Sequence, residues 1–264
     1  MQRIDGKVVW ITGASSGIGE ALTLALDQRR CRLIISARDE DALNQVKNNC
    51  AHSDNIKVLP LDLNDFNNMG QKVIKAYSFF NEIDILVNNA GVSQRSLIID
   101  TELEVYKKLM DINYLGTVAL TKSLLPYFIK HKKGHFVTVT SLMGKFGSPY
   151  RSGYCGAKHA LHGFFDVLRM EHQKDEIEVT LICPGFVKTN VAKNALTADG
   201  SLQVKDDVAT QNGLAASLFS KKMIRAIERK KFEAYIGKGE VKGIYLKRFF
   251  PKLLHRIVLR SQVI

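Results

Sequence analysis

The feature that most constrains the fold is an apolar run that leads directly into a glycine-rich turn and a helical pattern. Residues 7–12 are predicted to form a buried strand, and the turn that follows reads Gly13-Ala-Ser-Ser-Gly17-Ile-Gly19. Glycines allow the backbone to approach a phosphate closely, and the free N–H groups of a helix start favour an anion. In this context the turn predicts a dinucleotide-binding unit, with an ordinary strand-to-helix link as the plainer alternative.

Further apolar runs alternate with helical patterns along the chain. Strands are predicted at residues 32–37, 56–60, 83–87, 136–140, 178–183 and 233–236. This alternation is typical of an α/β fold with a doubly wound, Rossmann-like parallel sheet and helices on both faces. Ligands of such sheets bind beyond the carboxyl ends of the strands. Five predicted strand ends therefore converge on one rim, at Gly13, Arg38, Asp62, Asn89 and Ser141.

The stretch from residue 141 to residue 158 carries side chains suited to proton transfer. Tyr154 and Lys158 are four residues apart in a helical pattern, so they share one helix face. A phenol has a pKa near ~10, and a nearby ammonium lowers the pKa, which produces a general acid or base. Ser141 is placed to hold a carbonyl or alcohol oxygen. The plainer alternative is a helix that carries Tyr and Lys by chance.

The residue at the end of the second predicted strand bears on the choice of dinucleotide. An acidic residue there binds a ribose 2′-OH, whereas an arginine accommodates a 2′-phosphate. The residue is Arg38, which predicts NADP(H), with a lone surface arginine as the alternative. Asp39 follows it and keeps NAD(H) as the less favoured choice, since it can reach the ribose or cap the next helix.

Together these motifs resemble the short-chain dehydrogenase/reductase family in its compact single-domain form. The resemblance spans residues 6–236 and includes residues 12–19, Asn88-Asn-Ala-Gly91, Asn113, Ser141, Tyr154 with Lys158, and Pro184-Gly185. It implies about seven parallel strands and hydride transfer at a nicotinamide ring. We therefore expect one dinucleotide-binding domain at residues 1–240, followed by a basic amphipathic tail at residues 241–264.

The resemblance also assigns roles to individual residues. Tyr154 is expected to be the general acid/base, and Lys158 to lower its pKa and hold the nicotinamide ribose. Ser141 is expected to position the substrate oxygen, and Asn113 to hold a water that links Lys158 to solvent. The expected cofactor-binding residues are Gly13, Ser15, Ser16, Ile18, Arg38, Asp62, Leu63, Asn89, Ala90, Gly91, Tyr154, Lys158, Pro184, Gly185, Val187 and Thr189. No metal site is expected.

Two segments narrow the resemblance within the family. Residues 113–117 and 153–165 look like the branch that contains dehydrogenase/reductase member seven and relatives near 11-beta-hydroxysteroid dehydrogenase type one. That branch implies an NADP(H)-dependent enzyme that interconverts an alcohol and a ketone or aldehyde on a bulky steroid-, retinoid- or lipid-like substrate. Two alternatives are a 3-oxoacyl-[acyl-carrier-protein] reductase and a dinucleotide-binding regulator without turnover.

The charge distribution, the cysteines and the N-terminal segment indicate which partners and which compartment to expect. Half of the formal net charge of +12 falls within residues 241–264, and no nucleic-acid motif is present, so nucleic acid is not an expected partner. The four cysteines form no Cys-x-x-Cys pair and suit free thiols in a reducing compartment. The polar N-terminal segment lacks the membrane anchor that many members of the branch carry, so a cytoplasmic location is expected.

Two segments outside the motifs carry expectations of their own. Residues 102–130 are predicted to be helical with an interruption near Asn113 and Gly116, and residues 190–211 are predicted to be a lid-like loop. In the tail, basic residues fall between apolar ones at helical spacing, with a break or new helix at Pro251. The tail either lies peripherally on an anionic membrane or packs on a neighbouring subunit or over the substrate cleft. The family implies a homodimer or homotetramer.

Overall fold

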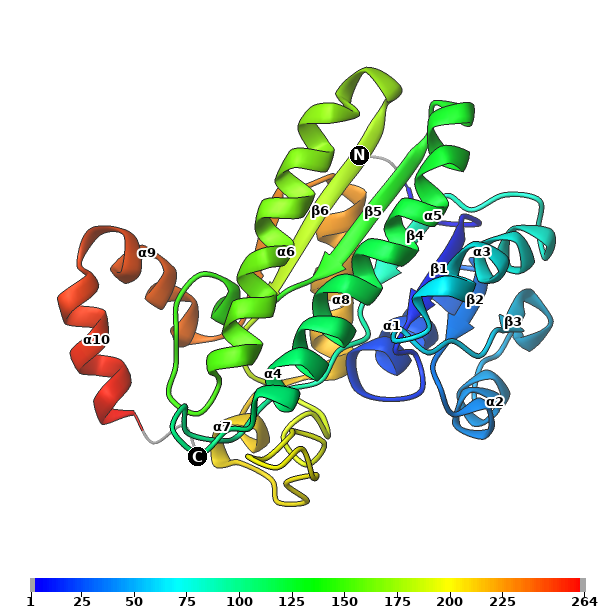
Figure 1. Cartoon of the computed structure of the whole chain (residues 1–264). Helices are drawn as coiled ribbons and strands as arrows, with labels where there is room; N and C mark the ends of the chain where they lie inside the picture. The colour runs from blue at the N-terminus through cyan, green and yellow to red at the C-terminus, as the bar shows by residue number, and fades with distance from the viewer. Residues whose placement is uncertain (1–2, 262–264) are drawn as a thin grey trace.

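A single sheet organises the chain, of which the computed structural model describes residues 3–261. The first two residues of the expected domain and residues 262–264 of the expected tail lie outside the described part. Seven strands pair in parallel in the order β3-β2-β1-β4-β5-β6-β9 (Figure 1). Their bounds are β1 Val8–Thr12, β2 Arg32–Ser36, β3 Ile56–Val58, β4 Ile85–Asn88, β5 Gly134–Val139, β6 Ile177–Pro184 and β9 Glu233–Ile236.

Alternation of side chains along the strands builds a core on each face of the sheet. In β1, Val9 and Ile11 contribute to one core, whereas Val8 and Trp10 contribute to the other. The first core is covered by α1 (Gly17–Asp27), α2 (Glu40–Asn48) and α8 (Ala216–Glu228); the second by α3 (Met69–Ser78), α5 (Gly116–His131) and α6 (Ser152–Glu171). Figure 1 shows α3, α5 and α6 in front of the sheet and α8 behind it. The predicted doubly wound α/β domain is therefore confirmed.

The strand order reverses between β1 and β4, and this reversal places the site. β1, β2 and β3 progress toward one edge, whereas β4, β5 and β6 progress toward the other. The connections at the carboxyl ends of β1 and β4 therefore diverge and leave a crevice, which is where open parallel sheets bind ligands.

The predicted interruption of the helix over residues 102–130 is present. The helix α4 (Leu103–Met110) passes through a π turn at Asp111–Leu115 before α5 begins at Gly116. Within this turn the Asn113 carbonyl accepts a hydrogen bond from the Thr117 hydroxyl (3.2 Å). Turns of this kind are common at functional sites, because they reorient one residue without ending the helix.

Two segments differ from the prediction. The third strand ends at Val58 rather than at residue 60, although the N–H groups of Leu59 and Leu61 still donate to the carbonyls of Ile35 and Ala37. The expected lid is partly ordered by a pair of short parallel strands at its two ends, β7 (Val187–Lys188) and β8 (Leu214–Ala215), and by α7 (Val208–Gln211). Such two-residue strands are too short to show periodicity in a sequence.

The C-terminal segment forms two helices that project from the body as an arm (Figure 1). These are α9 (Lys242–Phe249) and α10 (Pro251–Arg260), so Pro251 begins a new helix. Leu254 anchors the arm in a small core with Leu142, Phe146 and Cys183. The expected division into residues 1–240 and 241–264 stays a prediction. Within residues 3–261 no helix is long and apolar enough to cross a membrane.

Candidate active site

The glycine-rich turn lies where β1 ends and opens toward the crevice. Gly13 has φ +64°, and a Cβ at this position would lie 2.7 Å from the Cα of Ala90, so no side chain fits. Beyond it, Ser16 is extended and α1 starts at Gly17, and residues 15–18 line the crevice. A close backbone turn against a helix N-terminus is suited to a diphosphate, so the residues present fit a dinucleotide.

A clasp of hydrogen bonds joins this turn to the loop after β4. The Thr12 hydroxyl accepts from the backbone N–H groups of Asn89 (3.0 Å) and Ala90 (3.1 Å) and donates to the Val87 carbonyl (3.3 Å). The Asn89 amide donates to the carbonyls of Thr12 (2.9 Å) and Gly13 (3.1 Å). Sequence reasoning assigned Asn89 to the cofactor and missed Thr12, although this threonine closes the strand just before the glycine turn.

The crevice is a cavity of about 830 Å³. Every residue expected to bind the cofactor lines it, as does Ser141. Asn113 is the one predicted site residue that does not. The structure thus brings segments from six parts of the chain to one cavity, while the role of each residue stays a prediction.

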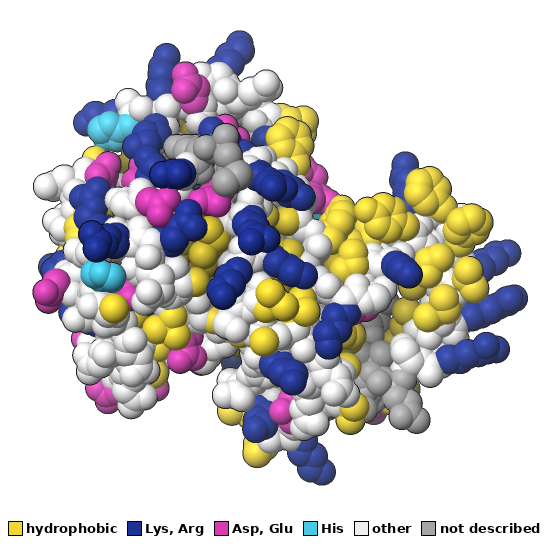
Figure 2. Space-filling model, turned by 180° about the vertical axis from the view of Figure 1, so that it is seen from behind, with side chains coloured by type: hydrophobic (Ala, Val, Ile, Leu, Met, Phe, Trp, Pro, Cys, Tyr) yellow, Lys and Arg dark blue, Asp and Glu magenta, His cyan; other side chains and the backbone are white. Residues whose placement is uncertain are grey.

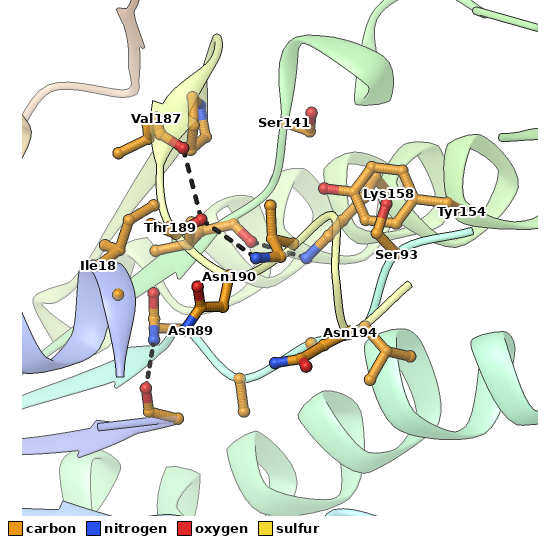
Figure 3. A pocket seen from close by; sticks show the side chains of 18 of the residues that line it. Ile18, Asn89, Ser93, Ser141, Tyr154, Lys158, Val187, Thr189, Asn190 and Asn194 are labelled. Atoms are coloured by element: carbon orange, nitrogen blue, oxygen red, sulfur yellow. Dashed lines mark hydrogen bonds between the residues drawn. The ribbon is translucent and has the colours of Figure 1, made fainter. Parts of the chain in front are cut away.

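Tyr154, Ser141 and Lys158 border the same part of the cavity (Figure 3). Tyr154 and Lys158 both project from α6, with the Lys158 Nζ 5.8 Å from the centroid of the Tyr154 ring. Ser141 follows β5, and its hydroxyl accepts from the Met143 N–H (3.0 Å), which fixes the turn. In Figure 3 the Tyr154 hydroxyl points away from its helix, into the space that Ile18, Asn89 and Thr189 border from other elements.

Lys158 is a buried cation, with 4% of its surface exposed. Its Nζ donates to the Val139 carbonyl (2.9 Å), and within residues 3–261 it forms no salt bridge with a carboxylate. Burial lowers the pKa of Lys158 to about 8. Gly91 leaves room chiefly for Asn113, since a Cβ there would lie 2.5 Å from the Asn113 Oδ1 but 3.4 Å from the Lys158 Nζ.

The pKa of Tyr154 differs from the sequence prediction. The pKa is raised, chiefly because burial disfavours the phenolate. A hydrogen bond with the Ser141 hydroxyl and the positive charges of Arg95 and Arg151 oppose the increase. The predicted lowering of the Tyr154 pKa is therefore wrong here, because burial outweighs the hydrogen bond and the positive charges that lower it.

The Asn113 side chain forms two hydrogen bonds with the backbone of the loop that follows β4. Its Oδ1 accepts from the Val92 N–H (2.9 Å), and its Nδ2 donates to the Val92 carbonyl (3.0 Å). The side chain is fully buried. Asn113 therefore fixes this loop beside Lys158, and its expected role in holding a water stays a prediction.

Sequence reasoning missed a buried charge cluster that holds the lid segment. Asp207 accepts from Arg95 (Nη2–Oδ2 2.6 Å) and lies 3.5 Å from the Arg151 Nη2. The three side chains are at most 6% exposed. Burial opposes ionisation of Asp207, but hydrogen bonds from Thr210 and Arg95 hold its pKa below the usual value. The cluster joins residues 190–211 to the start of α6 and places two arginine side chains near Tyr154.

Gln94 is a second positioning residue that the sequence did not reveal. Its Oε1 accepts from the N–H groups of Gly153 (2.7 Å) and Tyr154 (3.3 Å), at the start of α6. It is fully buried, and its Nε2 lies 3.1 Å from the Ser96 hydroxyl. Because this side chain satisfies two first-turn N–H groups, it fixes the helix end that carries Tyr154.

Arg38 and Asp39 line the cavity beside the end of β2 and differ in their contacts. Asp39 accepts from the Ala42 N–H (2.9 Å) and caps α2. Arg38 lines the cavity, is exposed, and forms no salt bridge within residues 3–261. The Asp39 carboxylate is therefore engaged, whereas Arg38 lines the cavity without a carboxylate partner among the described residues.

Comparisons with known proteins agree with this architecture. The short chain dehydrogenase family matches residues 7–200. A Drosophila melanogaster protein named dehydrogenase/reductase SDR family protein 7-like is 37% identical over 267 aligned positions, which cover 99% of this chain and 82% of that protein.

Solved structures share the fold. A short-chain dehydrogenase/reductase from Burkholderia phymatum in complex with NAD superposes with a TM-score of 0.85 at 21% identity over 96% of both chains. An alcohol dehydrogenase from the archaeon Thermococcus sibiricus, complexed with 5-hydroxy-NADP, gives 0.76 at 22% identity over 88% of this chain and 97% of that one.

The buried state of Lys158 predicts a pH dependence of stability. Its pKa is about 8 in the folded protein against 10.5 for an unperturbed lysine, so between these values the unfolded chain binds more protons and stability rises with pH. This contribution is about 2 kcal/mol between pH 7 and pH 9.5. Lys158→Met should remove it in denaturant titrations, whereas the exposed Lys222→Met should not. Equal slopes for Lys158→Met and wild type would contradict the burial of a titrating ammonium.

The charge cluster predicts a large effect for one substitution. Arg95→Met leaves the buried Asp207 carboxylate with a single arginine, which should lower the free energy of unfolding by about 3–5 kcal/mol. Lys107→Met breaks an exposed pair with Glu104 and should leave the stability nearly unchanged. Limited proteolysis should also cleave residues 190–211 faster in Arg95→Met. If both variants unfold alike, the cluster does not anchor the lid.

Proposed function

The chain belongs to the short-chain dehydrogenase/reductase family of oxidoreductases, and from this premise we propose an NADP(H)-dependent enzyme that interconverts an alcohol and a ketone or aldehyde on a bulky apolar substrate. The observation that carries the proposal is the gathering of Ser141, Tyr154 and Lys158 around one cavity with the glycine turn. This arrangement places a proton donor beside a turn that can bind phosphates. A regulator without turnover needs only the phosphate-binding turn.

Most of the residues that would hold the dinucleotide follow the ends of strands, including β1 and β4, which hydrogen bonds between Thr12 and Asn89 join. The start of α1 and Gly13 suit the phosphates, and Lys158 offers a cation at the opposite side of the cavity. A bound nicotinamide dinucleotide supplies hydride to a carbonyl carbon in reduction and accepts it in oxidation. The protein contributes orientation and proton transfer.

In this proposal, Tyr154 carries out the proton transfer. Its hydroxyl donates a proton to the substrate oxygen in reduction and removes one in oxidation, while the Ser141 hydroxyl holds the same oxygen. A phenol with the ordinary pKa of ~10 is protonated near neutral pH and can donate a proton, and burial raises the pKa of Tyr154 further. Lys158, with a pKa of about 8, can carry a proton or release it near neutral pH and so can resupply the phenol.

Two features support NADP(H) and an apolar substrate. Arg38 faces the cavity without a carboxylate partner in the described chain, while Asp39 is engaged as a helix cap. Beyond Tyr154 the walls of the cavity include Met143, Leu196 and Val258. A wall of this kind favours burial of a hydrocarbon body, with the carbonyl held at the polar end.

The proposed proton donor is tested by Tyr154→Phe. Loss of the hydroxyl alone should lower kcat by about 10²–10⁴-fold and leave NADPH affinity nearly unchanged. The matched control is Tyr150→Phe, which removes a nearby hydroxyl outside the cavity lining. Turnover is measured as NADPH oxidation with a panel of steroid, retinoid and 3-oxoacyl thioester carbonyls. Full activity of Tyr154→Phe on an accepted substrate would refute the assignment.

The proposed dinucleotide preference is tested by Arg38→Asp. Loss of a charge-assisted contact with a 2′-phosphate should weaken NADPH binding by about 10- to 100-fold, while NADH binding stays the same or improves. Fluorescence titration of both dinucleotides gives the ratio of dissociation constants, with the exposed Arg229→Asp as control. Equal affinities of the wild-type protein for both would contradict the proposal.

A further inference from the structure

The arm formed by α9 and α10 presents a run of large apolar side chains to solvent. Exposed fractions lie between 46% and 67% for Tyr245, Phe249, Phe250, Leu253 and Ile257. Figure 2 shows these hydrophobic side chains gathered over the projecting part of the molecule, with Lys and Arg at its outer edge. Single exposed apolar residues are ordinary on a soluble protein, but a contiguous group marks an interaction surface.

The helix α10 divides its residues into four stripes at i, i+4 spacing, one of which holds Pro251, His255 and the exposed Leu259. Leu254 and Val258 face the body and pack in the small core with Phe146. Leu253 and Ile257 form a second stripe that is nearly half exposed. The third stripe is basic and lies beside the second; its members are Lys252, Arg256 and Arg260.

The charges of the arm lack internal partners. No Asp or Glu occurs at residues 241–264, and within residues 3–261 none of the basic side chains of α9 and α10 forms a salt bridge. Lys242, Lys247 and Arg248 add three positive charges on α9. The surface therefore combines an apolar ridge with an uncompensated positive flank, and its partner should be apolar and negatively charged.

The arm also borders the mouth of the candidate active site. Val258 and Ser261 line the same cavity as Tyr154, together with Val191 and Leu202 of the lid segment. Leu202, Val204 and Val208 of that segment are 55–74% exposed. In Figure 1 the end of α10, the lid and the loop before α4 lie at the same end of the molecule. A surface that binds the arm therefore meets the cavity mouth.

A second copy of this chain fits the arm poorly. A two-fold contact places the same patch on both sides, so the basic stripes of two arms would face each other. A bilayer that contains anionic lipid fits better, because aromatic and aliphatic side chains enter the headgroup boundary while Lys and Arg extend to the phosphates. The negative surface attracts each such cation.

We propose that the α9–α10 arm docks the protein reversibly on an anionic lipid bilayer and sets the mouth of the cavity against the lipid. Tyr245, Phe249 and Phe250 with the second stripe of α10 enter the interface, and the basic stripe contacts the headgroups. If the proposed oxidoreductase function holds, an apolar substrate passes from the bilayer into the cavity; docking itself does not depend on that function.

Vesicle sedimentation with the full chain tests the docking. The wild-type protein should pellet with phosphatidylcholine vesicles that contain phosphatidylserine, bind vesicles of phosphatidylcholine alone at least tenfold more weakly, and dissociate as salt rises. Wild-type protein that stays in the supernatant with both vesicles at low salt would overturn the proposal, whatever its catalytic activity.

Charge-reversal variants test which part of the protein contacts the vesicle. Each cation at an anionic surface strengthens binding by about fivefold, so Lys252→Glu/Arg256→Glu should weaken the partition coefficient more than about 25-fold. Lys221→Glu/Lys222→Glu changes net charge equally on the exposed part of α8 and should bind nearly as the wild type does. Equal losses in the two variants would mean nonspecific attraction and would overturn the assignment to the arm.

The apolar stripe is tested in the same assay. Leu253→Ser/Ile257→Ser should weaken partition at least tenfold, and thermal unfolding should match the wild type because both side chains are outside the core. The control is Ile74→Ser/Met170→Ser, at similarly exposed apolar positions on α3 and α6. If Leu253→Ser/Ile257→Ser instead converts a wild-type dimer to a monomer in analytical ultracentrifugation and leaves vesicle binding intact, the arm binds a second copy and the proposal is wrong.

Discussion

The burial of one cation, Lys158, at the end of β5 is the constraint on which the site depends. A buried ammonium needs a hydrogen-bond acceptor, and the Val139 carbonyl provides it, which fixes α6 against the sheet. The loop after β4 passes beside this cation, where Gly91 leaves room for Asn113 and Asn113 holds the backbone of Val92. The clasp between Thr12 and Asn89 then ties that loop to the glycine turn. A proton donor and a phosphate cradle thereby share one cavity.

The sheet could be predicted from the sequence because it follows from local pattern. The family resemblance supplied most of the residues expected to bind the cofactor, and all of these residues line the cavity. Buried parallel strands appear as apolar runs, and their carboxyl ends must meet at one edge. Position along the chain does not reveal how charges pair in space. Arg95 and Asp207 are far apart in the sequence and in segments without periodicity, so nothing local connects them. The sequence also predicts the wrong direction for the pKa of Tyr154. Its burial, which raises the pKa, depends on the packing of the whole fold and outweighs the groups that lower it.

The C-terminal arm shows how one amphipathic pattern can serve two purposes. Sequence reasoning left packing and membrane contact as alternatives. In the structure Leu254 packs into the body, whereas Leu253, one position earlier, faces solvent. A helix with two apolar stripes can do both, and spacing alone does not separate them. The cytoplasmic location and the homo-oligomeric state stay predictions that neither the fold nor the relatives address.

Transfer of deuterium from NADPH labelled at C4 of the nicotinamide tests the central claim most directly. The protein is incubated with the labelled dinucleotide and a bulky apolar ketone, and the product is analysed by mass spectrometry. Our account predicts an alcohol that carries one deuterium at the former carbonyl carbon. Binding of both compounds without label in the product, across the ketones and aldehydes tested, would contradict it.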